Sequence, residues 1–260
     1  MISCLCITRG DRLAMLAEAV ADFSRQTMPD RELVILHDGP TALDHAINEI
    51  AGQHTHCVVR VVQVPPGLKL GGLRNAAVAA AQGDWVCQWD DDDRYHPARL
   101  ALQHDAAQQQ GTDVCYLVDQ LHWFQEEGRL CWDDWNFESY PVNVIQGTIL
   151  ARRRVMPDYP DLSRGEDTLH THAIMRAAAQ SGRSVARLRG AGWCYIYRHH
   201  GGNVWSAAHH GAISGLKHLP PATLLPRWKA LGQRLSEYSP PLPRLYMPVG
   251  AKIVLVNEPV

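Results

Sequence analysis

The hydrophobic and polar positions of the first 118 residues change period repeatedly, which predicts strands and helices in alternation. Residues 2–7 form a short apolar run, typical of a strand covered on both faces, and further strands are predicted at residues 32–36, 58–64, 85–89 and 113–118. Apolar residues at helical spacing fill the segments between them, at residues 13–23, 43–50, 73–81 and 97–110, with Pro97 in the first turn of the last helix. This order predicts an α/β fold in which helices flank a mainly parallel central sheet.

The pattern changes in the second half of the chain. Residues 123–140 carry several aromatic side chains with little periodicity, so we expect irregular structure there. Residues 147–151 and 193–197 resemble strands, and residues 166–179 a helix. From residue 216 the chain is rich in proline, with one short helix expected at 227–235. We therefore predict a single main domain, residues 1–215, and a Pro-rich C-terminal extension, residues 216–260.

Composition narrows the class of protein. The chain has 25 Lys plus Arg against 27 Asp plus Glu and a formal net charge of -2, so a general nucleic-acid binder is not expected. Hydrophobic residues make up 46%, as in a globular protein. We find no apolar run near the ~18 residues of a membrane span, and no basic start typical of a signal peptide.

The cysteines indicate the compartment. Their number is odd, at seven, and no C-x-x-C pair occurs, so we expect buried thiols rather than a disulfide framework or a zinc site. We expect a cytoplasmic protein, free or peripheral to a membrane surface. The sequence does not indicate an oligomeric state, and a homo-oligomer is one of the options.

Candidate chemistry gathers where the predicted strands end. Thr8 and Arg9 follow the first strand, Asp38 the second, and a run of four aspartates, 90–93, the fourth. Ligands of open α/β sheets bind at this edge. Neighbouring carboxylates ~4 Å apart repel by about 4 kcal/mol at an effective dielectric of 20, which a divalent cation relieves. Oxygen ligands favour Mg²⁺ or Mn²⁺. The alternative is a solvated acidic turn in which Asp93 caps the next helix.

Three further features have competing interpretations. The pair Asp133–Asp134 is a rival acidic site, but it does not follow a predicted parallel strand. The spacing of Ser163 and Glu166 fits a capping box ahead of a helix, which would make Glu166 structural. The aromatic faces of Trp123, Trp132, Trp135 and Trp205 suit either the core or a groove for an acceptor sugar.

Five segments together resemble the family-2 glycosyltransferases of the GT-A fold. Residues 89–97, WDDDDRYHP, resemble the D-x-D segment of that family. Four other segments match in the same order: ELVILHDG at 32–39, GLRNA at 72–76, GED at 165–167 and YRHHGGN at 197–203. The resemblance spans about residues 2–205. Two departures are Thr8-Arg9-Gly10-Asp11, where Pro-Thr-Tyr-Asn is common, and His37, where a second Asp is common.

The resemblance implies a role for each matched residue. It implies the catalytic base at Asp167 and a metal ligand at Asp92, with His200 near the metal and the diphosphate. It also implies donor contacts by Asp38 at the nucleobase, by Arg74 near the diphosphate or the base, and by Asp90 at the ribose or metal, with Asp91 as an alternative register of the motif. Thr8 and Arg9 depart from the family pattern, and we expect them to contact the donor because of their position at the end of the first strand.

These residues lead to a hypothesis about function. We expect a metal-dependent, inverting glycosyltransferase that uses Mn²⁺ or Mg²⁺ and moves a sugar from a nucleoside-diphosphate sugar, in the first place a UDP-sugar, to an acceptor hydroxyl. The acceptor, whether a glycan, a lipid-linked sugar or a small molecule, is not indicated. One alternative is a catalytically inactive module that binds a nucleotide sugar. The other is a metal-dependent phosphohydrolase or nucleotidyltransferase that uses the aspartate cluster.

Overall fold

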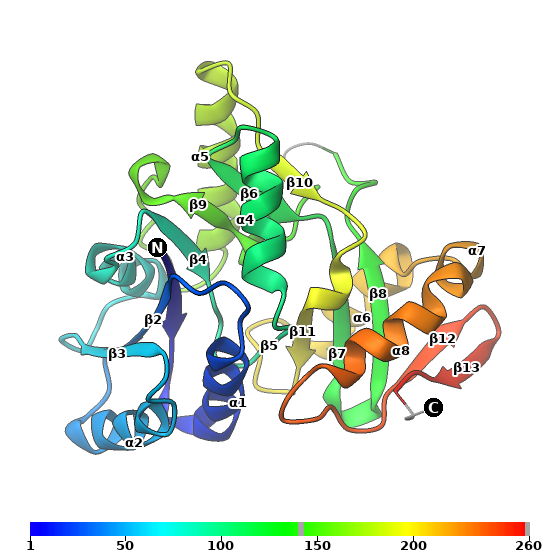
Figure 1. Ribbon diagram of the computed structural model, residues 1–260, viewed down its shortest axis with the longest axis horizontal. Coiled ribbons are helices and arrows are strands. Elements are labelled where there is room, and N and C mark those ends of the chain that lie inside the picture. The colour runs from blue at the N-terminus through cyan, green and yellow to red at the C-terminus, as the bar shows by residue number, and fades with distance from the viewer. Residues whose placement is uncertain (140–142, 258–260) are drawn as a thin grey trace.

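The computed structural model describes residues 1–139 and 143–257, which form two sheets side by side with helices around them (Figure 1). The first sheet has seven strands in the order β10-β6-β9-β4-β1-β2-β3. Its strands are β1 (Ile2–Ile7), β2 (Arg31–His37), β3 (Val58–Gln63), β4 (Trp85–Gln88), β6 (Val114–Leu117), β9 (Leu150–Arg152) and β10 (Ala186–Leu188). β1 to β4 are parallel, as are β6 and β10, whereas β9 runs antiparallel to both of its neighbours.

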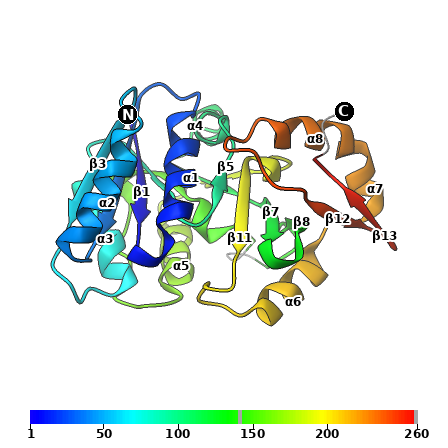
Figure 2. The ribbon, with the colours of Figure 1, turned by 90° about the horizontal axis from the view of Figure 1, so that it is seen from below.

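Helices cover both faces of this sheet, as the alternation of periods predicts (Figure 2). The helices are α1 (Leu13–Ser24), α2 (Thr41–Gly52), α3 (Leu70–Ala80), α4 (Arg99–Gln109), α5 (Glu166–Gln180), α6 (Ala207–Lys217), α7 (Pro221–Leu224) and α8 (Trp228–Ser236). Apolar side chains of α1, α2 and α4 pack on the face that carries Cys4 and Leu33. α3 and α5 pack on the opposite face, where Val34 and Tyr116 point.

The elements expected in residues 1–118 are confirmed to within a few residues at each end. One detail is wrong: α4 begins at Arg99 after an N-cap at Ala98, so Pro97 lies before the helix rather than in its first turn. All seven cysteines are unpaired thiols, six of them buried. None of the helices in the described part of the chain is long and apolar enough to cross a membrane.

Most of the strands that the sequence pattern did not predict belong to a second sheet. Its order is β13-β12-β8-β7-β11-β5. Its strands are β5 (Arg94–Tyr95), β7 (Asp119–Phe124), β8 (Arg129–Asp134), β11 (Tyr195–His199), β12 (Tyr246–Val249) and β13 (Lys252–Leu255). The expectation of irregular structure in residues 123–140 is wrong for residues 123–134, which belong to the hairpin of β7 and β8; residue 140 lies outside the described residues.

The physical reason is that polar residues of this hairpin are buried and hydrogen-bonded. His122 Nδ1 and Ser214 Oγ lie 3.0 and 2.7 Å from Asp133 Oδ2, and Trp132 Nε1 donates to Asp119 Oδ2 at 2.7 Å. A polar side chain satisfied in this way costs little to bury. The alternation of polar and apolar positions that marks a half-exposed strand is therefore absent.

Residues after 215 build part of this second sheet and its core. The helix expected at 227–235 is confirmed as α8, but α7, β12 and β13 also form, and β12 pairs with β8. Leu219, Leu231 and Met247 are buried in one cluster with Leu121 and Trp132. Residue 215 lies within α6, so the expected boundary does not coincide with the end of an element. The division into a domain and an extension stays a prediction.

Candidate active site

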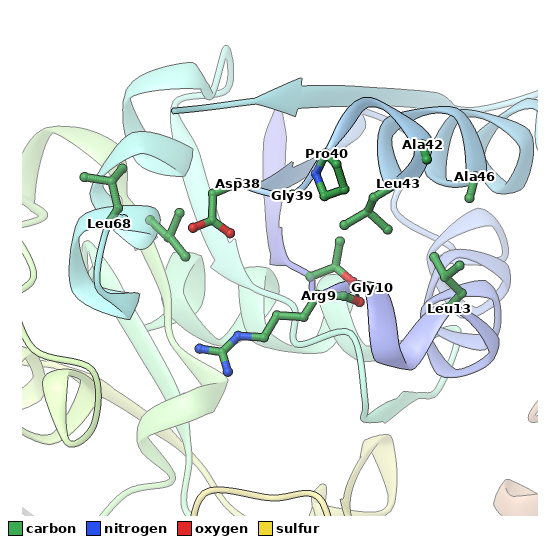
Figure 3. A pocket seen from close by; sticks show the side chains of 12 residues that line it. Arg9, Gly10, Leu13, Asp38, Gly39, Pro40, Ala42, Leu43, Ala46 and Leu68 are labelled. Carbon is green, nitrogen blue, oxygen red and sulfur yellow. Dashed lines mark hydrogen bonds between the residues drawn. The ribbon is translucent and has the colours of Figure 1, made fainter. Parts of the chain in front are cut away.

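The carboxyl ends of β1, β2 and β4 open on one edge of the first sheet, beside a cavity of about 540 Å³ (Figure 3). Thr8, Arg9 and Asp38 line it, together with apolar side chains that include Leu43 and Leu68. Figure 3 shows the side chains of Asp38 and Arg9 extending into the open space near Leu68. The backbone N–H of Gly67 donates a hydrogen bond of 3.4 Å to Asp38 Oδ2. Three of the residues expected to bind the donor therefore share one cavity.

The four aspartates after β4 have different environments. Asp91 and Asp93 are 1% exposed, whereas Asp90 and Asp92 are partly open to solvent. Asp93 accepts hydrogen bonds from Tyr195 Oη at 2.5 Å and from the backbone N–H of Arg198 at 2.9 Å. It thus ties the strand end to β11 and does not cap α4, so that interpretation of Asp93 is wrong. Burial and the charges of Asp92 and Asp90 raise the pKa of Asp93 well above its usual range.

Arg74 links the aspartate run to the segment that contains the predicted base. It lies on α3, and its Nε donates to Glu166 Oε1 at 3.0 Å while both terminal nitrogens lie 3.3 Å from Asp90 Oδ1. Arg74 is 9% exposed and Glu166 2% exposed. Gln88 Nε2 donates to the other oxygen of Asp90 at 2.8 Å. Asp90 is therefore held in a fixed orientation at the end of β4.

Asp91 and Asp92 share a partner that the sequence reasoning missed. Arg12, at the end of a 3₁₀ turn (Gly10–Arg12) and the N-cap of α1, places one terminal nitrogen 3.2 Å from Asp91 Oδ1 and hydrogen-bonds to Asp92 Oδ2 with the other. His200 Nε2 lies 3.2 Å from the same oxygen of Asp92. The sequence did contain a signal for this contact: Arg12 lies in the first turn after β1, which ends at the candidate site.

The charges of these groups move their pKa values in opposite directions. Burial, and next the charge of Asp92, raise the pKa of Asp91 to about 7. Burial also acts to raise the pKa of Asp92, but the hydrogen bond with His200 and the charge of Arg12 outweigh it and hold that pKa below its usual value. These contacts favour the ionised form of Asp92, which is the form that a metal ligand requires.

Asp167 lies in the first turn of α5, next to Glu166. It is partly exposed, and its Oδ1 accepts hydrogen bonds from the backbone N–H and the hydroxyl of Thr168 at 2.7 and 3.4 Å. Burial acts to lower the pKa of Arg74, but nearby negative charges outweigh burial and raise that pKa. Asp90 makes the largest of these contributions, and Asp167 is close enough to add a smaller one. The capping-box interpretation is wrong, because the N-cap of α5 is Gly165, with φ of 74°, and no side chain caps the helix there.

The rival acidic pair is not equivalent to this site. Cys131, Asp133 and His218 form a compact set of metal-type ligands in the described part of the chain. However, His218 Nδ1 already accepts the N–H of Trp132 at 3.0 Å, and its Nε2 lies 2.7 Å from the carbonyl oxygen of Pro248. His218 therefore links β8 to β12 in the second sheet and does not belong to the strand ends of the first sheet.

The buried ion pairs of Arg74 give a first prediction. Arg74→Met should lower the free energy of unfolding by about 3 kcal/mol or more, because Glu166 and Asp90 would be left without their counter-charge. Urea denaturation measures it. The control is Arg25→Met, which removes an exposed arginine after the end of α1. Equal stability of the Arg74→Met variant and the parent protein would contradict a structural role for these contacts.

His170, one turn further along α5, predicts how stability depends on pH. It stacks on Tyr159 at 3.7 Å between ring centroids, and burial lowers its pKa to about 4. Since the unfolded chain binds a proton near pH 6.5, stability should fall as the pH drops from 6.5 toward 4, at up to about 1.4 kcal/mol per pH unit for this group. Unfolding curves should show a shallower pH dependence for His170→Phe than for the parent. His45→Gln, at an exposed position, should keep the parental slope.

Comparison with known proteins shows the family of the chain. The family model for glycosyl transferase family 2 matches residues 5–165. The chain is 24% identical over 182 residues to the putative glycosyltransferase EpsE of Bacillus subtilis, which covers 67% of this chain and 57% of that protein. It is 34% identical over 71 residues to the succinoglycan biosynthesis protein ExoO of Rhizobium meliloti, covering 27% of this chain and 20% of that protein.

Solved structures share the fold at low sequence identity. TarS of S. aureus, residues 1–349 in complex with UDP-GlcNAc, superposes with a TM-score of 0.58 at 16% identity, over 92% of this chain and 67% of that one. The mannosyltransferase PcManGT of Pyrobaculum calidifontis, in complex with GDP-Man and Mn²⁺, has a TM-score of 0.56 at 14% identity, over 91% of this chain and 63% of that one.

The molecule thus has an α/β fold of the GT-A type, with mixed, mainly parallel strands and flanking helices. Because the family model covers more than half of the sequence, the chain belongs to glycosyl transferase family 2. It spans 57% of the length of its Bacillus relative, so the activity of the whole protein is a matter for proposal.

Proposed function

We propose that this chain is a metal-dependent, inverting glycosyltransferase that moves a sugar from a nucleoside-diphosphate sugar, with a UDP-sugar as the expected donor, to an acceptor hydroxyl. The observation that carries the proposal is the meeting of Asp92, His200 and the Arg74–Asp90 pair at the end of β4, beside the cavity that holds Asp38. Two structures with the same fold support the donor class: one is a complex with UDP-GlcNAc, the other with GDP-Man and Mn²⁺.

The cavity at the ends of β1 and β2 is proposed as the nucleotide site. Its volume of about 540 Å³ suits a small molecule. The carboxylate of Asp38 accepts hydrogen bonds from the N–H groups of a base edge or from a ribose hydroxyl. Arg9 reaches the same space in Figure 3, and its planar guanidinium suits a diphosphate. Leu43 and Leu68 offer apolar surface for the flat face of a base.

The acidic side of the site has the chemistry that a hard divalent cation needs. Among the described residues, Asp91 Oδ2 is buried without a hydrogen-bond partner. Asp92 and His200 approach each other at 3.2 Å, which gives a mixed set of carboxylate and imidazole donors. We assign Asp92 and His200 as the residues that would hold Mn²⁺ or Mg²⁺. Asp90 and Asp91 precede Asp92 in the run and would add negative charge close to the ion. The ion would supply several kcal/mol of charge stabilisation to the departing diphosphate.

Asp167 is proposed to take the proton of the acceptor hydroxyl. Two features support this role: Asp167 is partly exposed, and its neighbour Glu166 is tied through Arg74 to Asp90. In a direct displacement the acceptor oxygen attacks the anomeric carbon as the bond to the diphosphate breaks, so the configuration inverts. Positioned proton removal contributes about 10²- to 10⁴-fold to such a step.

Product analysis tests this proposal. The purified protein is incubated with UDP-, GDP- and dTDP-sugars and Mn²⁺, and the released species are identified. Release of a nucleoside diphosphate supports glycosyl transfer. Release of a nucleoside monophosphate and a sugar 1-phosphate would instead identify a phosphohydrolase. Release of pyrophosphate, when a nucleoside triphosphate and a sugar 1-phosphate are supplied, would identify a nucleotidyltransferase. Donor binding without turnover against a broad panel of acceptors would indicate an inactive nucleotide-sugar-binding module.

A further inference from the structure

Arg12 brings a positive charge to the place where the proposed metal would bind. Its two terminal nitrogens contact Asp91 and Asp92 separately, so the guanidinium bridges the two carboxylates. The side chain of Arg12 is 23% exposed, against 2% for Asp91 and 13% for Asp92, so the contact is largely closed to solvent. Burial acts to lower the pKa of Arg12, but the charges of Asp92 and Asp91 outweigh it and raise that pKa.

Each aspartate of the run has a partner in the described structure, and Asp91 and Asp92 share one. Asp90 faces Arg74, and Asp93 receives the hydroxyl of Tyr195 and a backbone N–H. Asp91 and Asp92 face Arg12, and His200 adds a further contact to Asp92. The acidic run is thus compensated by the chain itself. Without Arg12, the two central carboxylates would repel each other at the strand end.

A divalent ion and the guanidinium of Arg12 cannot share this position. Both need the lone pairs of Asp92 Oδ2, which already meets Arg12 and His200. Two positive groups held a few ångströms apart also repel strongly in a partly buried site. Arg12 comes from the N-terminal turn of α1, whereas the carboxylates belong to the segment after β4, so its side chain can leave without any movement of the ligands.

We propose that Arg12 is an internal counter-cation that a divalent ion displaces from Asp91 and Asp92. The inference rests on the metal site of the proposed function and adds a property to it: Arg12 stabilises the metal-free protein and weakens its affinity for the metal. The two effects are linked, because a group that favours the metal-free state must oppose metal binding by the same free energy.

Metal affinity in the absence of donor tests the exchange. Mn²⁺ binding is measured by calorimetry and by the electron paramagnetic resonance signal of free Mn²⁺, on the parent, Arg12→Ala and Arg25→Ala. We expect Arg12→Ala to bind Mn²⁺ on the order of tenfold more tightly than the parent. We also expect Arg12→Ala to have a lower melting temperature than the parent in EDTA. Added Mn²⁺ should raise the melting temperature of the variant by more than that of the parent. Arg25→Ala, which lacks an exposed arginine at the far end of α1, should match the parent.

Equal or weaker Mn²⁺ affinity of Arg12→Ala would overturn the exchange, as would a failure of both proteins to bind the ion. If Arg12→Ala does not fold, Arg12→Gln, which keeps a polar side chain without the charge, takes its place with the same expectations. Failure of the proposed function is a separate result: tighter Mn²⁺ binding by the variant, combined with no release of nucleoside diphosphate from any donor, keeps the exchange and rejects the transferase.

Discussion

Asp92→Asn should abolish Mn²⁺-dependent binding of a nucleoside diphosphate and lower the transfer rate by at least about 10²-fold. The substitution keeps the size of the side chain but removes the charge that Arg12 and His200 now contact. Among the four aspartates, Asp92 combines partial exposure with a lowered pKa, so its carboxylate is ionised and reachable. An amide at this position is a much weaker ligand for a hard cation.

Calorimetric titration of the variant with UDP, with and without Mn²⁺, measures this effect. Asp105→Asn is the matched control, because it removes an exposed carboxylate of α4 and should behave as the parent does. Metal-dependent binding of normal affinity by Asp92→Asn would show that another residue holds the ion. Asp91, with its unpartnered buried oxygen, would then become the leading candidate.

Asp167→Asn should lower the transfer rate by about 10²- to 10⁴-fold while the affinity for the donor stays close to that of the parent. The reason is that Asp167 accepts hydrogen bonds from Thr168 in the first turn of α5, whereas the donor contacts are assigned to Arg74 on α3 and to residues at the ends of β1, β2 and β4. Rates with a saturating donor, and donor affinity from calorimetry, separate the two effects.

A substitution of the neighbouring acid should have a different effect. Glu166→Gln weakens a buried ion pair with Arg74, so it should lower the free energy of unfolding, which Asp167→Asn should leave nearly unchanged. If Asp167→Asn transfers sugar at the parental rate, Asp167 is not the base.

The central strands of the first sheet could be predicted because they are buried on both faces. All six residues of β1 are buried, and the residues of β2 after Arg31 are buried as well, so both strands are mostly apolar. β3 lies at the edge of the sheet and is only partly buried. The second sheet could not be predicted in the same way. In β7 and β8, residues such as Asp119, His122 and Asp133 are buried as partners in hydrogen bonds, which hides the hydrophobic period. β12 and β13 depend on pairing with distant parts of the chain.

The candidate site was predictable where residues follow a strand directly. Thr8, Asp38 and Asp90 lie at one edge for that reason, and the resemblance to the family pointed to His200. The order of residues in the sequence could not show which residue contacts which aspartate. Arg12 reaches Asp92 across 80 positions, and Tyr195 reaches Asp93 across 102, so only the folded chain shows that one carboxylate is compensated by a cation and another by a hydroxyl.

Binding of a nucleoside diphosphate to the purified protein, with and without divalent metal, tests most directly whether the end of β4 is a metal-dependent nucleotide site. UDP is titrated into the parent protein in Mn²⁺ and again in EDTA, and then into Asp92→Asn in Mn²⁺. We predict saturable binding by the parent in Mn²⁺, with loss of that binding in EDTA and in the variant. Binding of equal affinity in all three titrations, or no binding of UDP, GDP or dTDP by the parent in Mn²⁺, would contradict the proposed site.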